Sequence, residues 1–393
     1  MQRSQAAAFD LRWRKPETLI TVDDYRRVAS RRLPEMIWSY VDGGADDLIT
    51  LEDNRAAFKR WTLRPRMLAG IKKCDLGTTV AGEPVSLPVL LAPTGLAGLS
   101  HWRGDVAAAR AAERCGTRYI LSTASSWTIE EVAEATSADH FFQLYARSGP
   151  LTESLLRRAW DSGNRVMFLT VDTPVVGNRV WERKAGMGRP PVLTPGRVAD
   201  VARHPLWLYG TLRHRRVSGR NLVAAGGFRA AGTAVDIQVR ELMQATLTWD
   251  DAAWVRNLWP GKLFVKGILE ASDAQRALEL GFDGVVVSNH GGRQLDGARA
   301  TLDCLPEIVA AVGERMEVLL DGGIRRGSDV VKALALGARA VLVGRPYLYG
   351  LAADGEAGVA AVLEIFREEL ERTLTLLGVT AVRDLGPDQL ARR

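Results

Sequence analysis

The sequence predicts an α/β fold: a (β/α)8 TIM barrel with an N-terminal helical arm and a long insertion after the fourth strand. Two observations support this fold. From Leu87 onward, a short apolar strand, a polar turn and an amphipathic helix follow one another eight times in about 290 residues, which is the count of such a barrel. The stretch before Leu87 reads instead as mainly helical. A doubly wound open sheet is the alternative, and eight regular units make it the weaker one.

The strands are predicted at short apolar runs of the kind that are buried in a parallel sheet. Glycines close the helices between them, because a helix commonly stops in a left-handed turn. Thr128, Thr152 and Ser272 are expected as helix N-caps. The predicted strands are Val89–Ala92, Tyr119–Ser122, Phe141–Leu144, Val166–Val171, Leu263–Val265, Val285–Val287, Val318–Leu320 and Ala340–Val343, and the closing glycines are Gly116, Gly163, Gly281 and Gly337.

Residues 1–86 form the predicted arm, and residues 87–393 form the predicted barrel. In the arm, helices are expected from Thr21 or Val22 to Ser30 and from Pro34 to Gly43, with Pro34 in the first turn of its helix. After the eighth strand, Gly355–Leu377 has apolar residues at helical spacing and should pack outside the barrel.

The regular alternation breaks at about residues 175–247, where an insertion delays the fourth helix by about seventy residues. An insertion at this place leaves the C-terminal end of strand four, which is the catalytic face of such barrels. It holds twelve lysines and arginines and four acidic residues, a local charge of +8. The whole chain carries +6, so the remainder is slightly negative and the positive charge belongs to the insertion.

The composition is that of a globular protein, with 47% hydrophobic and 25% charged residues. Cys74, Cys115 and Cys304 lie far apart without a CxxC pair, so neither a disulfide framework nor a metal site is predicted. The first sixteen residues lack the apolar core of a secretory signal. No run approaches the ~18 apolar residues that span a bilayer. These observations predict a cytoplasmic protein.

The segment 287–296, Val-Ser-Asn-His-Gly-Gly-Arg-Gln-Leu-Asp, carries the strongest functional signal. It follows a buried apolar strand and places His290 three residues before Arg293. A histidine there can take or give a proton near neutral pH, and an arginine can hold a carboxylate. An isolated His-x-x-Arg would more simply be a satisfied histidine and a solvated arginine. The surrounding glycines and the rest of the chain favour a functional site.

Polar residues at the C-terminal ends of barrel strands point at one site. Lys266 is costly to bury unless it meets an anion or an electron-rich cofactor, although an internal ion pair is the structural alternative. The residues at these strand ends are Pro93, Thr94, Gly95, Ser122, Gln143, Tyr145, Thr170, Asp172, Lys266, Ser288, His290, Arg293, Asp321, Gly323, Arg325, Gly344 and Arg345.

The last two strand ends predict a phosphate site. Glycines allow backbone N–H groups to approach a phosphate, and Arg325 and Arg345 would neutralise it. Barrels often hold phosphates after strands seven and eight, which is where Gly323 and Gly344 lie. The strand position makes this glycine-rich signal specific.

Together these motifs resemble the FMN-dependent L-2-hydroxy acid dehydrogenases and oxidases, the group that contains glycolate oxidase, L-lactate dehydrogenase and (S)-mandelate dehydrogenase. The resemblance covers nearly everything from Asp23 to Leu385 and implies bound FMN and a 2-hydroxy acid substrate. The motifs that carry it are Leu-Pro-Glu-Met-Ile-Trp-Ser-Tyr at 33–40, Leu-Ala-Pro-Thr-Gly at 91–95, Phe-Gln-Leu-Tyr at 142–145, Thr-Val-Asp-Thr-Pro at 170–174, Val-Lys-Gly at 265–267, and the segments 288–296, 320–327 and 344–346.

The resemblance implies a role for each matching residue. His290 is the base, and Asp172 orients it. Lys266 lies beside the flavin and stabilises negative charge on the reduced ring. Removal of hydrogen as a hydride or through a carbanion fits these roles equally. The expected substrate-binding residues are Arg293, Arg179 and Tyr40, with Tyr145 near the substrate hydroxyl, and the expected phosphate-binding residues are Gly323, Arg325, Gly344 and Arg345.

Two positions bear on the subclass. Gly95 stands where relatives that react readily with oxygen often have alanine, which favours a dehydrogenase, although Gly95 could simply serve a turn. Ala124 stands where glycolate oxidases have tryptophan, which makes room for lactate or mandelate. A flavin oxidase that produces hydrogen peroxide is the alternative activity.

The insertion joins an aromatic and apolar patch to a basic tail. Residues 203–220 contain five arginines and no acidic residue, and Trp207 and Tyr209 lie among them. This composition suits anionic lipid on the cytoplasmic face of the inner membrane, where a quinone or a protein could accept the electrons. A subunit interface or a solvated loop is the alternative, and nucleic acid is disfavoured. The resemblance further implies a homotetramer.

Overall fold

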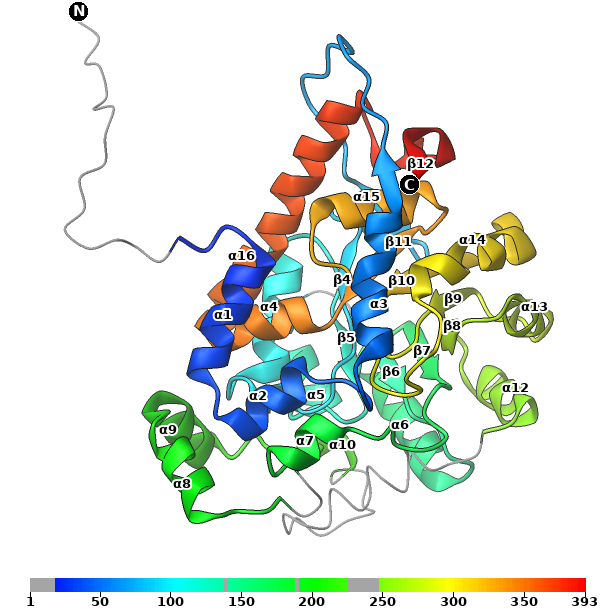
Figure 1. Cartoon of the computed structure of the whole chain (residues 1–393). Coiled ribbons are helices and arrows are strands. Elements are labelled where there is room, and N and C mark those ends of the chain that lie inside the picture. The colour runs from blue at the N-terminus through cyan, green and yellow to red at the C-terminus, as the bar shows by residue number, and fades with distance from the viewer. Residues whose placement is uncertain (1–17, 138–139, 188–190, 223, 225–246) are drawn as a thin grey trace, which may run out of the picture.

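A computed structural model describes residues 18–137, 140–187, 191–222, 224 and 247–393, and these include a closed barrel of eight parallel strands (Figure 1). The strand order runs once around the barrel, and a parallel bridge between Leu91 and Tyr119 joins the first strand to the second. The predicted fold class is therefore confirmed. The strands are β4 (Val89–Leu91), β5 (Ile120–Ser122), β6 (Phe141–Leu144), β7 (Val166–Thr170), β8 (Lys262–Ile268), β9 (Gly284–Val287), β10 (Glu317–Asp321) and β11 (Ala340–Val343).

Large apolar side chains fill the inside of the barrel. Phe141, Phe168 and Phe264 point inward from three neighbouring strands and pack ring against ring, with centroids 5.0–6.0 Å apart. The opposite faces of the strands pack under the surrounding helices, so every residue of most strands is buried. This double burial is why the strands could be recognised as continuous apolar runs.

Each barrel strand is followed along the chain by a helix that packs outside it. The predicted helix Gly355–Leu377 is present: Asp354 and Gly355 have non-helical backbone angles, and they separate it from an earlier helical segment that begins at Arg345. The helices are α4 (Gly104–Arg114), α5 (Ile129–Glu134), α6 (Pro150–Asp161), α12 (Trp249–Leu258), α13 (Ala271–Glu279), α14 (Thr301–Val312), α15 (Gly327–Ala335) and α16 (Arg345–Leu377), with short 3-10 turns η2 (Ala97–Leu99), η4 (Gly313–Arg315), η5 (Val382–Asp384) and η6 (Pro387–Gln389).

Two of the three predicted N-caps are wrong. Thr128 caps α5 in a reciprocal capping box with Glu131, as expected. Thr152 lies inside α6, because that helix begins at Pro150 after Gly149, and its hydroxyl bonds Arg147 instead. Ser272 is the second residue of α13, whose N-cap is Glu270. A serine or threonine therefore does not identify the N-cap reliably when a nearby proline or strand end determines where the helix begins.

The described part of the arm contains three α-helices, of which the first two lie where the sequence predicts them, and it also contains strands. A hairpin of two of these strands caps the barrel, since Val80 and Val85 join the apolar cluster inside it. A third strand pairs with the C-terminal β12 (Leu390–Arg392). The arm elements are α1 (Val22–Arg32), α2 (Glu35–Asp42), α3 (Ile49–Ala57), η1 (Phe58–Arg60), β1 (Trp61–Leu63), β2 (Thr78–Val80) and β3 (Glu83–Val85). Residues 1–17 of the predicted arm lie outside the described residues.

The described part of the insertion is helical and lies beside α2 (Figure 1). Its backbone is packed closely against the loop after β4, since a Cβ atom at Gly98 would come within 1.9 Å of the Arg216 carbonyl oxygen. Trp207 donates to the Leu99 carbonyl at 2.7 Å, and His214 stacks on Trp102. The helices are α7 (Val180–Lys184), α8 (Pro195–Ala202), α9 (Pro205–His214) and α10 (Arg220–Leu222). Residues 188–190, 223 and 225–246 of the predicted insertion lie outside the described residues.

Candidate functional site

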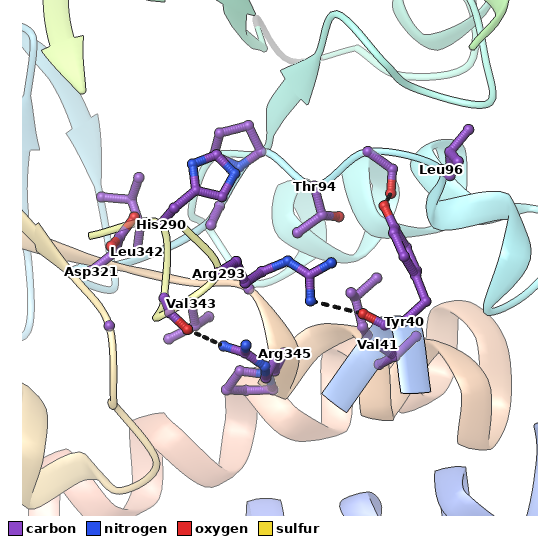
Figure 2. Close-up of a pocket in the computed structure, with 18 of the residues that line it drawn as sticks. Tyr40, Val41, Thr94, Leu96, His290, Arg293, Asp321, Leu342, Val343 and Arg345 are labelled. Carbon is purple, nitrogen blue, oxygen red and sulfur yellow. Dashed lines mark hydrogen bonds between the residues drawn. The ribbon is translucent and has the colours of Figure 1, made fainter. Parts of the chain in front are cut away.

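A cavity of about 230 Å³ lies at the C-terminal ends of the barrel strands (Figure 2). Strands β8, β10 and β11 and the segment that follows β4 contribute to its wall, and α2 from the arm closes one side. It therefore collects residues that are as far apart in the chain as Tyr40 and Arg345. The predicted site residues that line it are Tyr40, Pro93, Thr94, Gly95, Tyr145, Arg179, Lys266, His290, Arg293, Asp321, Gly323, Arg325, Gly344 and Arg345.

His290 and Asp172 form a buried pair at one end of the cavity. The Nδ1 atom of His290 lies 3.0 Å from Oδ1 of Asp172. Burial lowers the pKa of His290, and the nearby Lys266 and Arg179 act in the same direction, against the opposing pull of Asp172. Burial raises the pKa of Asp172, but His290, the charge of Lys266 and a backbone hydrogen bond together outweigh it, so the pKa of Asp172 is lowered. An ionised Asp172 therefore accepts the Nδ1 proton, and a neutral His290 keeps the Nε2 lone pair for an incoming proton.

The backbone is specially shaped around this pair. His290 has a φ of 59°, in the left-handed region that side chains other than glycine rarely adopt. Gly267 has a φ of 112°, and a Cβ atom there would lie 2.5 Å from the Cβ of Asp172. The glycine of the Val-Lys-Gly motif thus allows Asp172 to approach β8. Strained residues of this kind are typical of functional sites.

Two arginines meet at a buried glutamate that the sequence analysis did not identify. Arg293 donates to Oε1 of Glu182 at 2.8 Å, and Nη1 of Arg179 lies 3.8 Å from Oε2 of the same carboxylate. Arg293 also donates to the carbonyl oxygens of Tyr40 and Gly43, both at 2.9 Å. Glu182 is 5% exposed. The spacing of Arg179 and Glu182 on the start of α7 was a signal for this ion pair.

Lys266 is held by an anion and a hydroxyl, so the internal ion pair considered as an alternative is present. Its Nζ atom lies 3.0 Å from Oδ2 of Asp321 and donates to the Ser288 hydroxyl at 2.9 Å. Burial lowers the pKa of Lys266, but Asp321 and Asp172 outweigh it and the pKa is raised. Lys266 is therefore charged, and because it also lines the cavity, the pair and a role toward a ligand are compatible.

Four predicted cofactor residues do not line the cavity: Ser288, which accepts a hydrogen bond from Lys266, and three residues on neighbouring strands. The Ser122 hydroxyl donates to the Gln143 side-chain oxygen at 3.0 Å, and the Gln143 amide donates to Thr170 at 2.9 Å. All three are buried, with exposures of 1–2%, and none is among the residues that line the cavity. The structure brings them together as a polar row along β5, β6 and β7.

Two tyrosines stand on the wall near the base. Tyr40 donates from its hydroxyl to the Gly95 carbonyl at 2.9 Å, and its ring lies 5.1 Å from the Arg293 guanidinium. Burial raises the pKa of Tyr145, with a further contribution from the charge of Asp172. Tyr145 is therefore protonated and offers a hydroxyl near His290 and Arg179.

The other end of the cavity fits a phosphate. Gly323 and Gly344 lie there, and α16 begins immediately after Gly344, so that its free N–H groups and helix dipole favour an anion. The Nε atoms of Arg325 and Arg345 are buried and have no hydrogen-bond partner within the described residues. Burial, with the nearby charges of Arg293 and Arg325, lowers the pKa of Arg345 to about 10. This concentration of positive charge matches the phosphate of FMN.

Sequence reasoning identified Arg179 of the insertion but missed two other residues of the insertion that line the cavity. Val217 and Ser218, which follow α9, line it together with Leu96 and Ala124. No local motif marks Val217 or Ser218, because they reach the cavity only through the packing of the insertion on the barrel. Among the described residues, no three His, Cys, Asp or Glu side chains gather in a way that could hold a metal ion.

The comparison with protein families agrees with this geometry. The model of the family described as FMN-dependent dehydrogenase matches residues 29–392. The chain is 44% identical over 371 residues to an L-lactate oxidase from Nostoc, covering 93% of this chain and 96% of that protein. It is 40% identical over 377 residues to (S)-mandelate dehydrogenase from Pseudomonas putida, covering 95% of this chain and 94% of that protein.

Solved structures give the same result. A crystal structure of the monotopic membrane protein (S)-mandelate dehydrogenase superposes with a TM-score of 0.87 at 38% identity, covering 95% of this chain and 100% of that chain. A structure of a mandelate oxidase variant with (S)-mandelic acid superposes with a TM-score of 0.79 at 36% identity, covering 96% of this chain and 99% of that chain. Both dehydrogenases and oxidases are therefore among its relatives.

Proposed function

Because this chain belongs to the FMN-dependent dehydrogenase family, we propose that it oxidises a lactate- or mandelate-like L-2-hydroxy acid and passes the electrons to a membrane quinone. Its relatives are named as dehydrogenases or oxidases of lactate, mandelate and other 2-hydroxy acids, and the reaction common to them yields a 2-oxo acid. The observation that carries the proposal is the placement of His290, paired with Asp172, beside Arg293 in one cavity.

The residues around His290 can position a hydroxy acid and take its proton. Arg293 and Arg179 bind the carboxylate, which directs the carbinol carbon toward the base. His290 accepts a proton at Nε2 and becomes an imidazolium that Asp172 stabilises. Bound FMN supplies a two-electron acceptor. The charged Lys266, which lines the cavity, would stabilise negative charge on the reduced cofactor.

The neighbourhood of Ala124 supports a substrate larger than glycolate. Ala124 lines the cavity, and so do the apolar residues Leu96 and Val217. A small side chain at residue 124 leaves room for a methyl or a phenyl group, and the apolar neighbours favour such a group over a charged one.

The outer face of α9 supports binding to a membrane, where a quinone could accept the electrons. Leu206, Tyr209 and Leu212 are spaced three residues apart and are 65–84% exposed, while Trp207 on the inner face docks on the barrel. The exposed Arg203 extends this face with positive charge. Exposed apolar residues next to cations fit the interface of an anionic bilayer. No helix among the described residues is long and apolar enough to cross a membrane.

The substrate and the acceptor are tested with the FMN-loaded enzyme. Anaerobic mixing with L-lactate, (S)-mandelate or glycolate should bleach the flavin, with glycolate the slowest. Reoxidation should then be faster with a soluble ubiquinone analogue than with air. Fast reoxidation by air with stoichiometric hydrogen peroxide would instead establish that the enzyme is an oxidase. The 44% identity to an L-lactate oxidase is the reason to test this alternative.

The membrane surface is tested by substitution of its apolar residues. The triple variant Leu206→Ser, Tyr209→Ser, Leu212→Ser should lose sedimentation with phosphatidylglycerol vesicles at low salt and keep anaerobic flavin reduction. A matched control, Ile20→Ser with Leu376→Ser, removes equally exposed apolar residues elsewhere and should still sediment. If the parent protein stays in the supernatant, α9 is not a membrane surface. A change in sedimentation coefficient of the triple variant would then identify α9 as a subunit interface. We also propose a homotetramer, and sedimentation equilibrium of the parent protein tests it.

A further inference from the structure

Residues 216–221 of the insertion form a strap along one edge of the cavity. Val217 lines the cavity and is also 42% exposed, so its side chain lies between the ligand space and solvent. Ser218 lines the cavity beside it. The position of the strap therefore decides how much apolar wall a ligand meets at this edge.

The first end of the strap is clamped to the barrel by Arg216. Its Cζ atom lies 3.6 Å from the centroid of the Trp127 ring, and its guanidinium donates to Oε2 of Glu131 at 2.9 Å. The same oxygen accepts from the Thr128 N–H at 2.9 Å in the capping box that starts α5, so the carboxylate is itself held in place. A cation that is stacked on a tryptophan and paired with a fixed carboxylate restrains the backbone that carries it.

The second end of the strap is anchored by Asn221, which is fully buried. Its side-chain amide donates to the Ser125 hydroxyl at 2.9 Å, and its side-chain oxygen accepts from the Ile129 N–H at 2.9 Å. Arg158 of α6 donates to its carbonyl oxygen at 3.0 Å. The N–H of the preceding Arg220 donates to the Ser125 carbonyl at 2.9 Å. Because a buried amide is costly to leave without partners, these bonds fix this end of the strap.

Both ends of the strap grip the loop that carries Ala124, residues 123–128 between β5 and α5. The hydroxyl and the carbonyl of Ser125 bind the second end, and the ring of Trp127 binds the first. Ala124 immediately precedes these contacts and lines the cavity. The strap and this part of the cavity wall are therefore fixed relative to each other.

This part of the wall lies on the substrate side of the cavity. A Cβ atom at Gly95 would lie 3.3 Å from the Cβ of Ala124 and 3.5 Å from the hydroxyl oxygen of Tyr40. The Tyr40 ring lies 5.1 Å from the guanidinium of Arg293, the proposed carboxylate ligand (Figure 2). The substituent of a 2-hydroxy acid is bonded to the carbon next to that carboxylate, so it comes close to Ala124 and to the strap.

We propose that Arg216 and Asn221 are positioning residues that hold Val217 against the substituent of the substrate and thereby favour a large apolar substituent. This role rests on the proposed function, because it concerns which 2-hydroxy acid that site accepts. A phenyl group covers more of the apolar surface of Val217 than a methyl group does. The strap therefore contributes more to the binding of mandelate than to the binding of lactate.

A purely mechanical role is the simpler account, in which the two anchors only fasten the insertion to the barrel. Loosening the strap would then lower the stability of the protein or its activity toward both acids alike. If the anchors position Val217, the loss falls mainly on the acid with the large substituent. The ratio of the two acids therefore separates the accounts.

Val217→Ala tests the contact itself in the FMN-loaded enzyme. The kcat/KM for (S)-mandelate should fall about tenfold, chiefly through a higher KM, and that for L-lactate by less than about threefold. Arg216→Gln removes the cation from Trp127 and Glu131 and should give the same pattern, while Arg216→Lys keeps the charge without the flat stack and should restore part of the loss. Arg165→Gln is the matched control. It removes a cation that lies 4.0 Å from a tryptophan ring at the opposite end of the barrel, and it should leave both values unchanged.

Binding without turnover provides a second readout. In titration calorimetry, Asn221→Ala should bind phenylglyoxylate, the 2-oxo acid of mandelate, about tenfold more weakly than the parent does, and pyruvate, the 2-oxo acid of lactate, within about threefold. Amide hydrogen exchange in this variant should be faster in residues 216–222 and unchanged in the barrel strands. Asn164→Ala removes another buried asparagine, just before β7, and should change neither readout. If Asn221→Ala does not fold, the same titration of Arg216→Gln replaces it.

The outcomes distinguish the role of the strap from the proposed function. Equal losses for the two acids, or a ratio that stays at the parent value in Val217→Ala, would overturn the role of the strap alone. A parent protein that does not bind phenylglyoxylate would overturn it as well. A parent protein whose flavin is bleached by neither acid would contradict the proposed function, and the role of the strap with it.

Discussion

Replacing Asp172 with asparagine removes the negative charge of this side chain but keeps its size and shape. In the parent protein, the proton that His290 gains creates an imidazolium whose Nδ1 lies 3.0 Å from Oδ1 of Asp172. At an effective dielectric constant of about 20, two unit charges at that distance attract by roughly 5 kcal/mol. Asparagine keeps a hydrogen bond to Nδ1, which recovers part of this energy, so we expect a net loss of about 4 kcal/mol. That loss corresponds to roughly a thousandfold slower flavin reduction.

The same variant should change the pH dependence in a defined direction. His290 must be neutral to accept a proton, so the rate falls as the pH falls through its pKa. Asp172 raises that pKa against the effect of burial. Without the carboxylate, the pKa of His290 falls further, and the acid limb of the rate profile should move to lower pH although the maximum rate is smaller.

Anaerobic stopped-flow measurement of flavin bleaching at saturating substrate, between about pH 5 and pH 9, checks both effects. Asp42→Asn is a control, because it removes a carboxylate that bonds Arg26 and Tyr349 outside the cavity. It should leave the acid limb in place. If Asp172→Asn reduces its flavin within about tenfold of the parent rate, or if its acid limb moves to higher pH, the role of Asp172 is refuted.

Two further substitutions test the cavity wall. Arg293→Lys should raise KM and lower kcat/KM by roughly a hundredfold, because an ammonium group cannot bond the carbonyls of Tyr40 and Gly43 and a substrate carboxylate together as the forked guanidinium can. If the rate depends on substrate concentration as it does in the parent, Arg293 does not bind the carboxylate. Gly95→Ala places a Cβ atom 3.3 Å from that of Ala124, a contact that needs only a small shift. It should change the ratio of oxygen to dye reduction severalfold and the anaerobic rate by less than about threefold, and equal changes in both half-reactions would contradict this.

The barrel could be predicted from the sequence because its strands are buried on both faces. Runs such as Ala340–Val343 are continuous and apolar, and the predicted bounds agree with the structure within about three residues. The β2–β3 hairpin that closes one end was not predicted, because each of its strands has three residues and little apolar character. Its pairing depends on contacts with the barrel interior, which local patterns do not encode.

The functional site, too, could be predicted from the sequence only in part. Residues that follow strands, such as His290 and Lys266, could be placed by the rule that strand ends converge. The role of Glu182 could be anticipated only in part. Its spacing from Arg179 indicates a local ion pair. Its bond to Arg293, which lies 111 residues away in the chain, forms only through folding.

The charges around the cavity explain why it takes two anionic ligands. Among the described residues in and directly behind the wall, five cations face three carboxylates: Lys266, Arg179, Arg293, Arg325 and Arg345 against Asp172, Glu182 and Asp321. The carboxylates all lie at the end with His290 and Lys266, where they hold the arginines and the lysine in place. Within the described part of the chain, the guanidinium groups of Arg325 and Arg345 donate to backbone carbonyl oxygens rather than to a carboxylate, and only the backbone N–H of Arg325 bonds Asp329. The unbalanced end therefore suits a phosphate, which carries close to two charges, and the nearly balanced end suits a monocarboxylate that must leave as product.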